Sequence, residues 1–146
     1  MVEVDIQRRS PTAMVLTNYG QIFGSYTDYG NYKVEQLLYR WSQEEGFVDL
    51  DTIRADSVAP LKANDQGQCL ILLSHLSRLS HRFQHEVILW DPVKGAIYLH
   101  KQIGCKARQL LPVDMNKQGQ ILVQMYNKNG AIMNAAILTP LNEIQN

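Results

Sequence analysis

Three histidines in one short stretch come closer to a metal-binding pattern than any other residues of this chain. The stretch reads SHLSRLSHRFQH and contains His75, His81 and His85. A zinc ion needs three or four ligands that converge on one point, and a hairpin could bring His75 near His85. No similar cluster occurs elsewhere in the sequence. We therefore interpret these histidines as part of an exposed polar loop, with metal binding as the alternative, and we expect no bound cofactor.

The two cysteines do not indicate a disulfide framework or a nucleophile. Cys69 opens the apolar run 69–73, where a thiol acts as a small buried hydrophobic group. Cys105 follows Gly104 in a polar stretch, so we expect it to be exposed. Neither lies in a pattern with a histidine and a carboxylate, and the sequence therefore predicts no catalytic cysteine.

Composition limits what any motif in this chain can mean. The chain has 146 residues, of which 45% are hydrophobic and 19% charged, as in one globular domain with a sizeable core. The formal net charge is zero, so nothing global favours nucleic acid or an anionic membrane. No run approaches the ~18 apolar residues of a membrane span. The opening MVEVDIQRRS lacks the apolar segment of a secretory signal, so we expect a cytoplasmic chain or a targeting segment outside this sequence.

A short motif occurs three times and indicates internal repeats. It reads NYGQIFGSY, NDQGQCLILL and NKQGQILVQMY, with its glycines at Gly20, Gly67 and Gly119. The spacings between these glycines are 47 and 52 residues. Such periods are typical of folds in which like units pack side by side.

A second landmark follows two of the three motifs. Trp41 precedes Gly46 by five positions, and Trp90 precedes Gly95 by five. The third copy keeps the apolar strand but has Leu138 in place of tryptophan. A tryptophan that recurs at repeat spacing indicates packing between units rather than a binding platform.

Each unit is predicted to consist of four short strands. In the second unit these strands are 57–63, 69–73, 86–90 and 96–100, and 64–67 is a tight turn. The run 69–73 is apolar throughout, as expected of a strand that is buried on both faces. No segment keeps a 3.6-residue period over three turns, so we expect an all-β protein. Four antiparallel strands in about 40 to 50 residues are typical of a β-propeller blade.

The stretch 37–72, LLYRWSQEEGFVDLDTIRADSVAPLKANDQGQCLIL, resembles the bacterial HAF repeat. In that repeat an aromatic-rich strand leads through DLGTL to an NxxGQ turn. Here DLDTI stands at 49–53, and Asn64, Gly67 and Gln68 match the turn, while Glu35, Gln36 and Leu37 replace the name-giving His-Ala-Phe. The resemblance implies a propeller-like fold, often in secreted or cell-surface bacterial proteins, and it implies no catalytic residues. WD40 and kelch repeats are the rivals, although the WD pair at 90–91 has no Gly-His partner.

The units are predicted to span about 7–53, 54–103 and 104–146, with a strand at 1–6 that completes a blade. The opening MVEVDI aligns with VDLDTI, so Ile6 precedes Gly20 by fourteen residues, as Ile53 precedes Gly67. Three blades are too few for a closed propeller, which typically has four to eight. Two explanations remain. Two chains form a six-bladed homodimer by exchanging end strands, or this chain is a fragment of a longer propeller.

The basic residues are concentrated at one end of the predicted blades when each loop is assigned to the end from which it emerges. Ten of the fourteen basic residues fall in loops at one end, together with only two acidic residues, Asp28 and Asp56. The residues expected to bind a ligand there are Arg54, Arg78, His81, Arg82, Lys106 and Arg108. Such a face suits an anionic partner, either an acidic glycan or an acidic protein surface. Nucleic acid ranks last, because aromatic side chains for base stacking are sparse in these loops.

Three classes of function remain open at this point. A non-catalytic binding module is the favoured interpretation, because no catalytic constellation is visible. The second is an enzyme that acts on glycans in a central channel, for which Asp114 is the innermost-strand carboxylate. The third is a purely structural role in assembly.

Overall fold

The computed structural model describes residues 1, 3, 4, 6, 8, 10–30, 32–102, 109–127 and 129–140, without the side chain of Asp51. These residues form eleven β-strands and one short helix. The elements are β1 (Thr12–Leu16), β2 (Ile22–Tyr29), β3 (Val34–Ser42), β4 (Gly46–Ala55), β5 (Ser57–Ala63), β6 (Cys69–Leu76), β7 (Phe83–Asp91), β8 (Gly95–Tyr98), α1 (Leu99–Gln102), β9 (Gln109–Met115), β10 (Ile121–Tyr126) and β11 (Ile132–Leu138).

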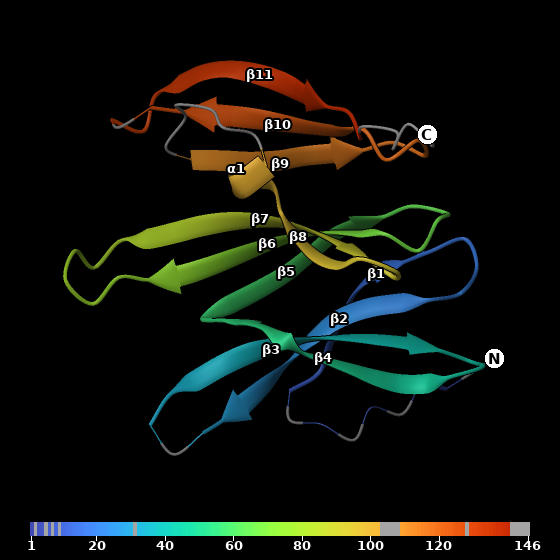
Figure 1. Ribbon diagram of the computed structural model, residues 1–146. Helices are drawn as coiled ribbons and strands as arrows, with labels where there is room; N and C mark the ends of the chain where they lie inside the picture. Colours follow the sequence, from blue (N-terminus) through green and yellow to red (C-terminus); the bar gives the residue numbers. More distant parts are fainter. Residues whose placement is uncertain are drawn as a thin grey trace.

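The strands form three separate antiparallel sheets, and each sheet pairs its strands in chain order. We call β1–β4 the first sheet, β5–β8 the second and β9–β11 the third. The sheets lie one above another, with the second sheet in the middle (Figure 1). The prediction of an all-β protein is therefore confirmed, and none of the three sheets closes on itself.

The second unit follows its predicted strands closely, with one error at the end. The strand at 57–63 is confirmed, whereas the strand predicted at 96–100 ends at Tyr98. Leu99 and His100 begin α1 instead. The pairing of β7 with β8 stops at Ile88 and Tyr98, because the chain leaves the sheet here to reach the third one. Leu99 turns inward and packs between the second and third sheets.

The two ends of the chain are only partly described. The third sheet has three strands in the described part of the chain, and 141–146 lie outside it. Of the predicted strand at 1–6, positions 2 and 5 lie outside the described residues, and positions 1, 3, 4 and 6 belong to no strand. A terminal strand that completes a blade therefore stays a prediction.

The repeated motif forms a turn in which the asparagine side chain adds hydrogen bonds to those of the backbone. The Oδ1 atom of Asn64 accepts hydrogen bonds from the backbone N–H groups of Gln66 and Gln68, both at 3.1 Å. Gly67 has a φ of 76°, a conformation that a side chain disfavours. The Asn116 turn repeats these contacts. In the first turn Thr17 takes this role, since its Oγ1 accepts from the N–H of Gln21 at 3.0 Å.

The core consists of two layers, one on each face of the second sheet. Cys69, Ile71 and Leu73 face the first sheet and pack with Phe23 and Leu38. The alternate residues of β6 and β7 face the third sheet; these are Leu70, Val87 and Leu89. The prediction that 69–73 is buried on both faces is confirmed, because this strand lies in the middle sheet of three.

The two tryptophans occupy equivalent positions with different surroundings. Trp90 lies between the first and second sheets, with its ring edge-on to that of Phe23 at 5.6 Å between centroids. Trp90 therefore has the packing role that its spacing predicts, here between two sheets. Trp41 instead packs on the outer face of the first sheet, against a cluster of Tyr26, Leu37 and Tyr39. No other sheet of the described chain covers that face.

Gly24 gives the first test of this packing. A Cβ atom at this position would lie 2.0 Å from the carbonyl oxygen of Thr12 and 2.5 Å from the ring of Tyr39. We expect Gly24→Ala to lower the free energy of unfolding by about 3 kcal/mol, because backbone atoms cannot move aside cheaply. Urea denaturation followed by circular dichroism measures the change. Gly30→Ala is the control, since its nearest neighbour is the Lys33 carbonyl oxygen at 3.1 Å. Equal stability of the Gly24 variant and the wild type would contradict this packing.

Candidate functional site

The loops between the second and third strands of each sheet gather at one end of the molecule. Asp56, which joins β4 to β5, connects two of these loops. Its Oδ2 atom accepts a hydrogen bond from the N–H of Leu76 at 2.7 Å, and its Oδ1 atom lies 3.8 Å from Nζ of Lys33. The loops of the first and second sheets therefore lie at the same end of the molecule, as predicted.

Part of the predicted positive charge at this end is neutralised by a strand residue. Glu35 accepts a hydrogen bond from Nζ of Lys33 at 2.9 Å and lies 3.5 Å from Nη1 of Arg54. The hydrogen bond to Glu35 raises the pKa of Lys33. Glu35 lies in β3 and therefore outside the loops whose charges define the predicted basic face. The basic face is thus weaker around Arg54 than the loop sequences alone indicate.

Three of the predicted ligand residues share one tight turn, 77–82. The N–H of Ser77 donates to the carbonyl of Arg82 at 3.0 Å, and the N–H of His81 donates to the carbonyl of Ser77 at 2.9 Å. His81 has a φ of 50°, which closes the turn. The side chains of Arg78, His81 and Arg82 are all exposed. The remaining two predicted residues, Lys106 and Arg108, lie outside the described residues.

The hairpin of β6 and β7 forms as predicted, but it separates the histidines. Ser74 pairs with His85 across the two strands, and His75 pairs with Gln84. Adjacent residues of a strand point to opposite faces, so His75 and His85 diverge. Oγ of Ser74 lies 2.8 Å from Nδ1 of His85. Within the described ranges, no three histidine, cysteine, aspartate or glutamate side chains are arranged to hold a metal ion.

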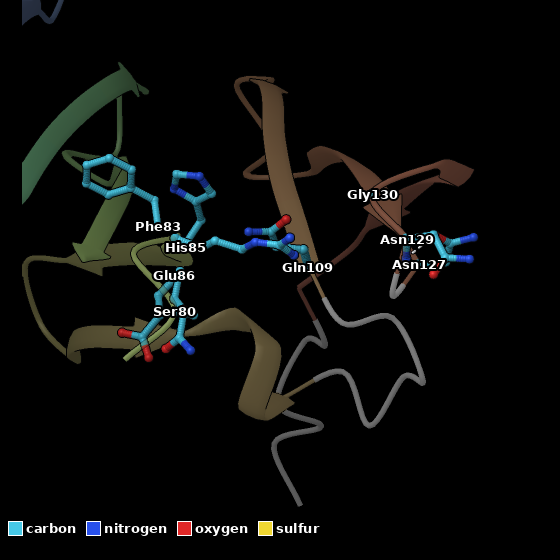
Figure 2. Close-up of a pocket in the computed structure, with 10 residues that line it drawn as sticks. Ser80, Phe83, His85, Glu86, Gln109, Asn127, Asn129 and Gly130 are labelled. Atoms are coloured by element: carbon cyan, nitrogen blue, oxygen red, sulfur yellow. Dashed lines mark hydrogen bonds between the residues drawn. The ribbon is translucent and has the colours of Figure 1, made fainter. Parts of the chain in front are cut away.

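An open cleft of about 740 Å³ lies between the second and third sheets at this end. One wall comes from the 77–82 turn and the start of β7, and the other from the turn between β10 and β11, with Gln109 between them (Figure 2). Half of its eight polar side chains are amides, and the others are a hydroxyl, a guanidinium, an imidazole and a carboxylate. The lining residues are Ser80, Arg82, Phe83, Gln84, His85, Glu86, Gln109, Asn127, Asn129 and Gly130.

The cleft combines hydrogen-bond donors with an exposed aromatic ring. Phe83 is exposed and stacks on His85, with centroids 6.4 Å apart and an interplanar angle of 13°. The Oδ1 atom of Asn127 already accepts from the N–H groups of Asn129 and Ala131, at 2.8 and 3.1 Å. Its Nδ2 group is therefore the part that can donate to a ligand. Arg82 forms no ion pair with the described residues.

Glu86 is the acidic residue of this cleft, and two histidines lie next to it. Its Oε2 atom lies 3.5 Å from Nε2 of His75, and its Oε1 atom lies 4.0 Å from Nε2 of His100. The carboxylate of this cleft thus has two imidazole groups within 4.0 Å.

Sequence reasoning found Arg82 but missed the amides opposite it. Asn127 and Gly130 repeat the spacing of Asn64 and Gly67, and Gly130 likewise has a positive φ of 75°. That spacing was the available signal for a turn at this point. Nothing in the sequence indicated that Asn127 and Gln109 would face β7, because the distance between sheets is a tertiary property.

The carboxylate considered for catalysis is paired with a lysine of the neighbouring sheet. Nζ of Lys62 donates to Oδ1 of Asp114, which joins β5 to β9. This hydrogen bond lowers the pKa of Asp114 below its ordinary value. A general acid in glycoside hydrolysis needs a carboxyl group whose pKa is raised. Asp114 therefore lacks the environment of a proton donor.

Comparison with family models, with curated proteins and with solved structures finds no match for this chain. The HAF-type resemblance accordingly stays a prediction from the motifs. In the described part of the chain, no helix has the length and apolarity that crossing a bilayer requires.

Cys69 provides a prediction about reactivity. It is fully buried between the first and second sheets, and burial raises the pKa of its thiol. Since the thiolate is the reactive form, we expect iodoacetamide at neutral pH to leave Cys69 unmodified in the native protein. Peptide mass spectrometry measures the modification, and the protein in guanidinium is the control, where Cys69 should react fully. Equal labelling in both states would contradict the burial.

Proposed function

We propose that the three sheets are blades of a β-propeller-like ring, and that two copies of the chain supply six blades. Each sheet pairs its strands in the same order, and successive sheets pack face to face. Two open ends remain on a stack of three sheets. A second copy would cover both, which is the physical motive for a homodimer. The rival is a longer chain of which this is a part.

We further propose that the protein is a non-catalytic binding module for an anionic glycan. The cleft that contains Arg82, Phe83 and the amides of Gln109 and Asn127 carries this proposal. Amide groups match the hydroxyl groups of a sugar, and an exposed aromatic ring matches its apolar face. A guanidinium group forms two parallel hydrogen bonds to a carboxylate, so Arg82 favours an acidic sugar.

The cleft favours a glycan over an acidic protein surface. Its walls come from two sheets, which leave an open cleft of about 740 Å³ between them. Binding in such a cleft suits a narrow chain with polar groups on all sides. The glycan-acting enzyme is the alternative, and the lowered pKa of Asp114 disfavours it. A structural role would leave the cleft without a ligand.

Calorimetric titration tests this function with one matched pair of ligands. The ligands are an oligosaccharide of uronic acids and the same oligosaccharide with its carboxylates converted to methyl esters. We expect the acidic form to bind at least ~10-fold more tightly, since a charged hydrogen bond contributes about 1.5 to 3 kcal/mol. We expect Arg82→Ala to remove that difference while weak binding of the ester persists.

Lys117→Ala is the control for general charge, because Lys117 is an exposed residue in the turn at the opposite end of the third sheet. It should leave both affinities unchanged. An equal loss in the Lys117 and Arg82 variants would show nonspecific attraction and reject the cleft. The absence of any binding to the acidic ligand at millimolar concentration would reject this class of ligand.

A further inference from the structure

One cross-strand pair recurs two residues after each turn glycine. These pairs are Ile22 with Trp41, Cys69 with Trp90, and Ile121 with Leu138. In the second sheet this pair faces the first sheet, and in the third sheet it faces the second. In the first sheet the same pair lies on the outer face, beside Tyr26, Leu37 and Tyr39. The second and third sheets thus direct the face that carries this pair toward the preceding sheet. In the described chain no sheet precedes the first one.

The next pair along each strand faces the other way. These pairs are Phe23 with Arg40, Leu70 with Leu89, and Leu122 with Ile137. Phe23 and Leu70 are fully buried and Leu89 is 6% exposed, because a following sheet covers them. Leu122 is 36% exposed and Ile137 65% exposed. The third sheet therefore presents, uncovered, the apolar surface that the first two sheets bury.

The turns repeat the same relation through their glutamines. The Oε1 atom of Gln21 lies 3.7 Å from the place of a Cβ on Gly67, and that of Gln68 lies 3.1 Å from the place of a Cβ on Gly119. Each glutamine thus covers the glycine of the following turn. Gln120 is held by Asn116 Nδ2 at 2.7 Å, as Gln68 is held by Asn64 Nδ2 at 2.8 Å. Among the described residues, and apart from its chain neighbours, no atom lies within 4 Å of the place of a Cβ on Gly20.

Residues near the start of the chain lie on this outer face of the first sheet. Ile53, at the end of the first sheet, is buried between the first and second sheets. Ile6 has the same spacing to its turn glycine and packs against the outer aromatic cluster of the first sheet. The guanidinium carbon of Arg8 lies 4.7 Å from the ring centroid of Phe47 on this face. The outer face of the first sheet thus already receives the segment that elsewhere arrives from a preceding sheet.

We infer that the outer face of the third sheet binds the outer face of the first sheet of a second copy of this chain. Leu122 and Ile137 of one copy pack against the Ile22 and Trp41 face of the other, and Gln120 covers Gly20 of that copy. The contact joins two different surfaces, so a two-fold pair of such contacts closes six sheets into a ring. This inference rests on the proposed ring and specifies its joint. A second copy is the occupant because its first sheet presents Ile22 and Trp41, and the equivalent pairs of the second and third sheets pack against a preceding sheet.

Paired variants test whether the joint unites two different faces. The double variant Leu122→Asp and Ile137→Asp places two carboxylates on the outer face of the third sheet. Both positions are exposed, so the fold should survive. Trp41→Glu blocks the first sheet. In light scattering at about 10 μM chain we expect wild type at twice the 16.7 kDa chain mass and each variant at one chain mass, a loss of affinity of at least ~100-fold. A mixture of the two variants retains one intact joint, and native mass spectrometry should detect their heterodimer.

Val93→Asp is the matched control, since Val93 is an exposed apolar residue in a turn of the second sheet. It should dimerise as the wild type does. A monomeric wild type would overturn the joint and the ring, whereas dimerisation by the third-sheet variant alone would overturn only the joint. If Trp41→Glu fails to fold, the third-sheet variant still decides. Glycan binding by the monomeric third-sheet variant tests the cleft separately, because the cleft lies within one chain.

Discussion

Burial of β6 on both faces is the constraint on which the rest of this structure depends. The apolar residues 69–73 cannot be covered by one neighbouring layer, so the second sheet requires another sheet on each side. Phe23 and Trp90 fill one interface, and Leu70 and Val123 fill the other. Nothing in this packing limits the stack to three sheets. The first and third sheets keep the same alternation of apolar residues on their outer faces, and Ile6 packs on the outer face of the first sheet.

The glycine–glutamine turns connect this packing to the geometry between sheets. A glycine at positive φ closes each turn and leaves no side chain, and at Gly67 and Gly119 the glutamine of the preceding turn occupies the space. The turns therefore set how closely adjacent sheets approach at one end. At the other end the loops are free to differ, as the histidine-containing turn at 77–82 and the asparagine turn at 127–130 do. The proposed cleft lies at that end, where the packing does not specify the side chains.

The surroundings of each basic side chain at this end depend on the tertiary structure and not on the loop sequence alone. The net charge is zero and the loops are basic, yet Glu35 neutralises Lys33 and Arg54. Arg82 lies across from neutral amides instead. A guanidinium group surrounded by amides recognises one kind of ligand, whereas a uniformly basic surface attracts every anion.

Local sequence specifies the turns and most of the strands, because alternation of side chains and glycine at positive φ are local properties. It predicted β5 and the two-faced burial of β6 correctly, and it placed Arg78, His81 and Arg82 in one loop. Tertiary structure alone decided that Leu99 leaves the sheet, that His75 and His85 diverge, and that Gln109 and Asn127 complete the cleft. Strand register and the spacing of stacked sheets control these outcomes, and both depend on contacts between residues far apart in the chain.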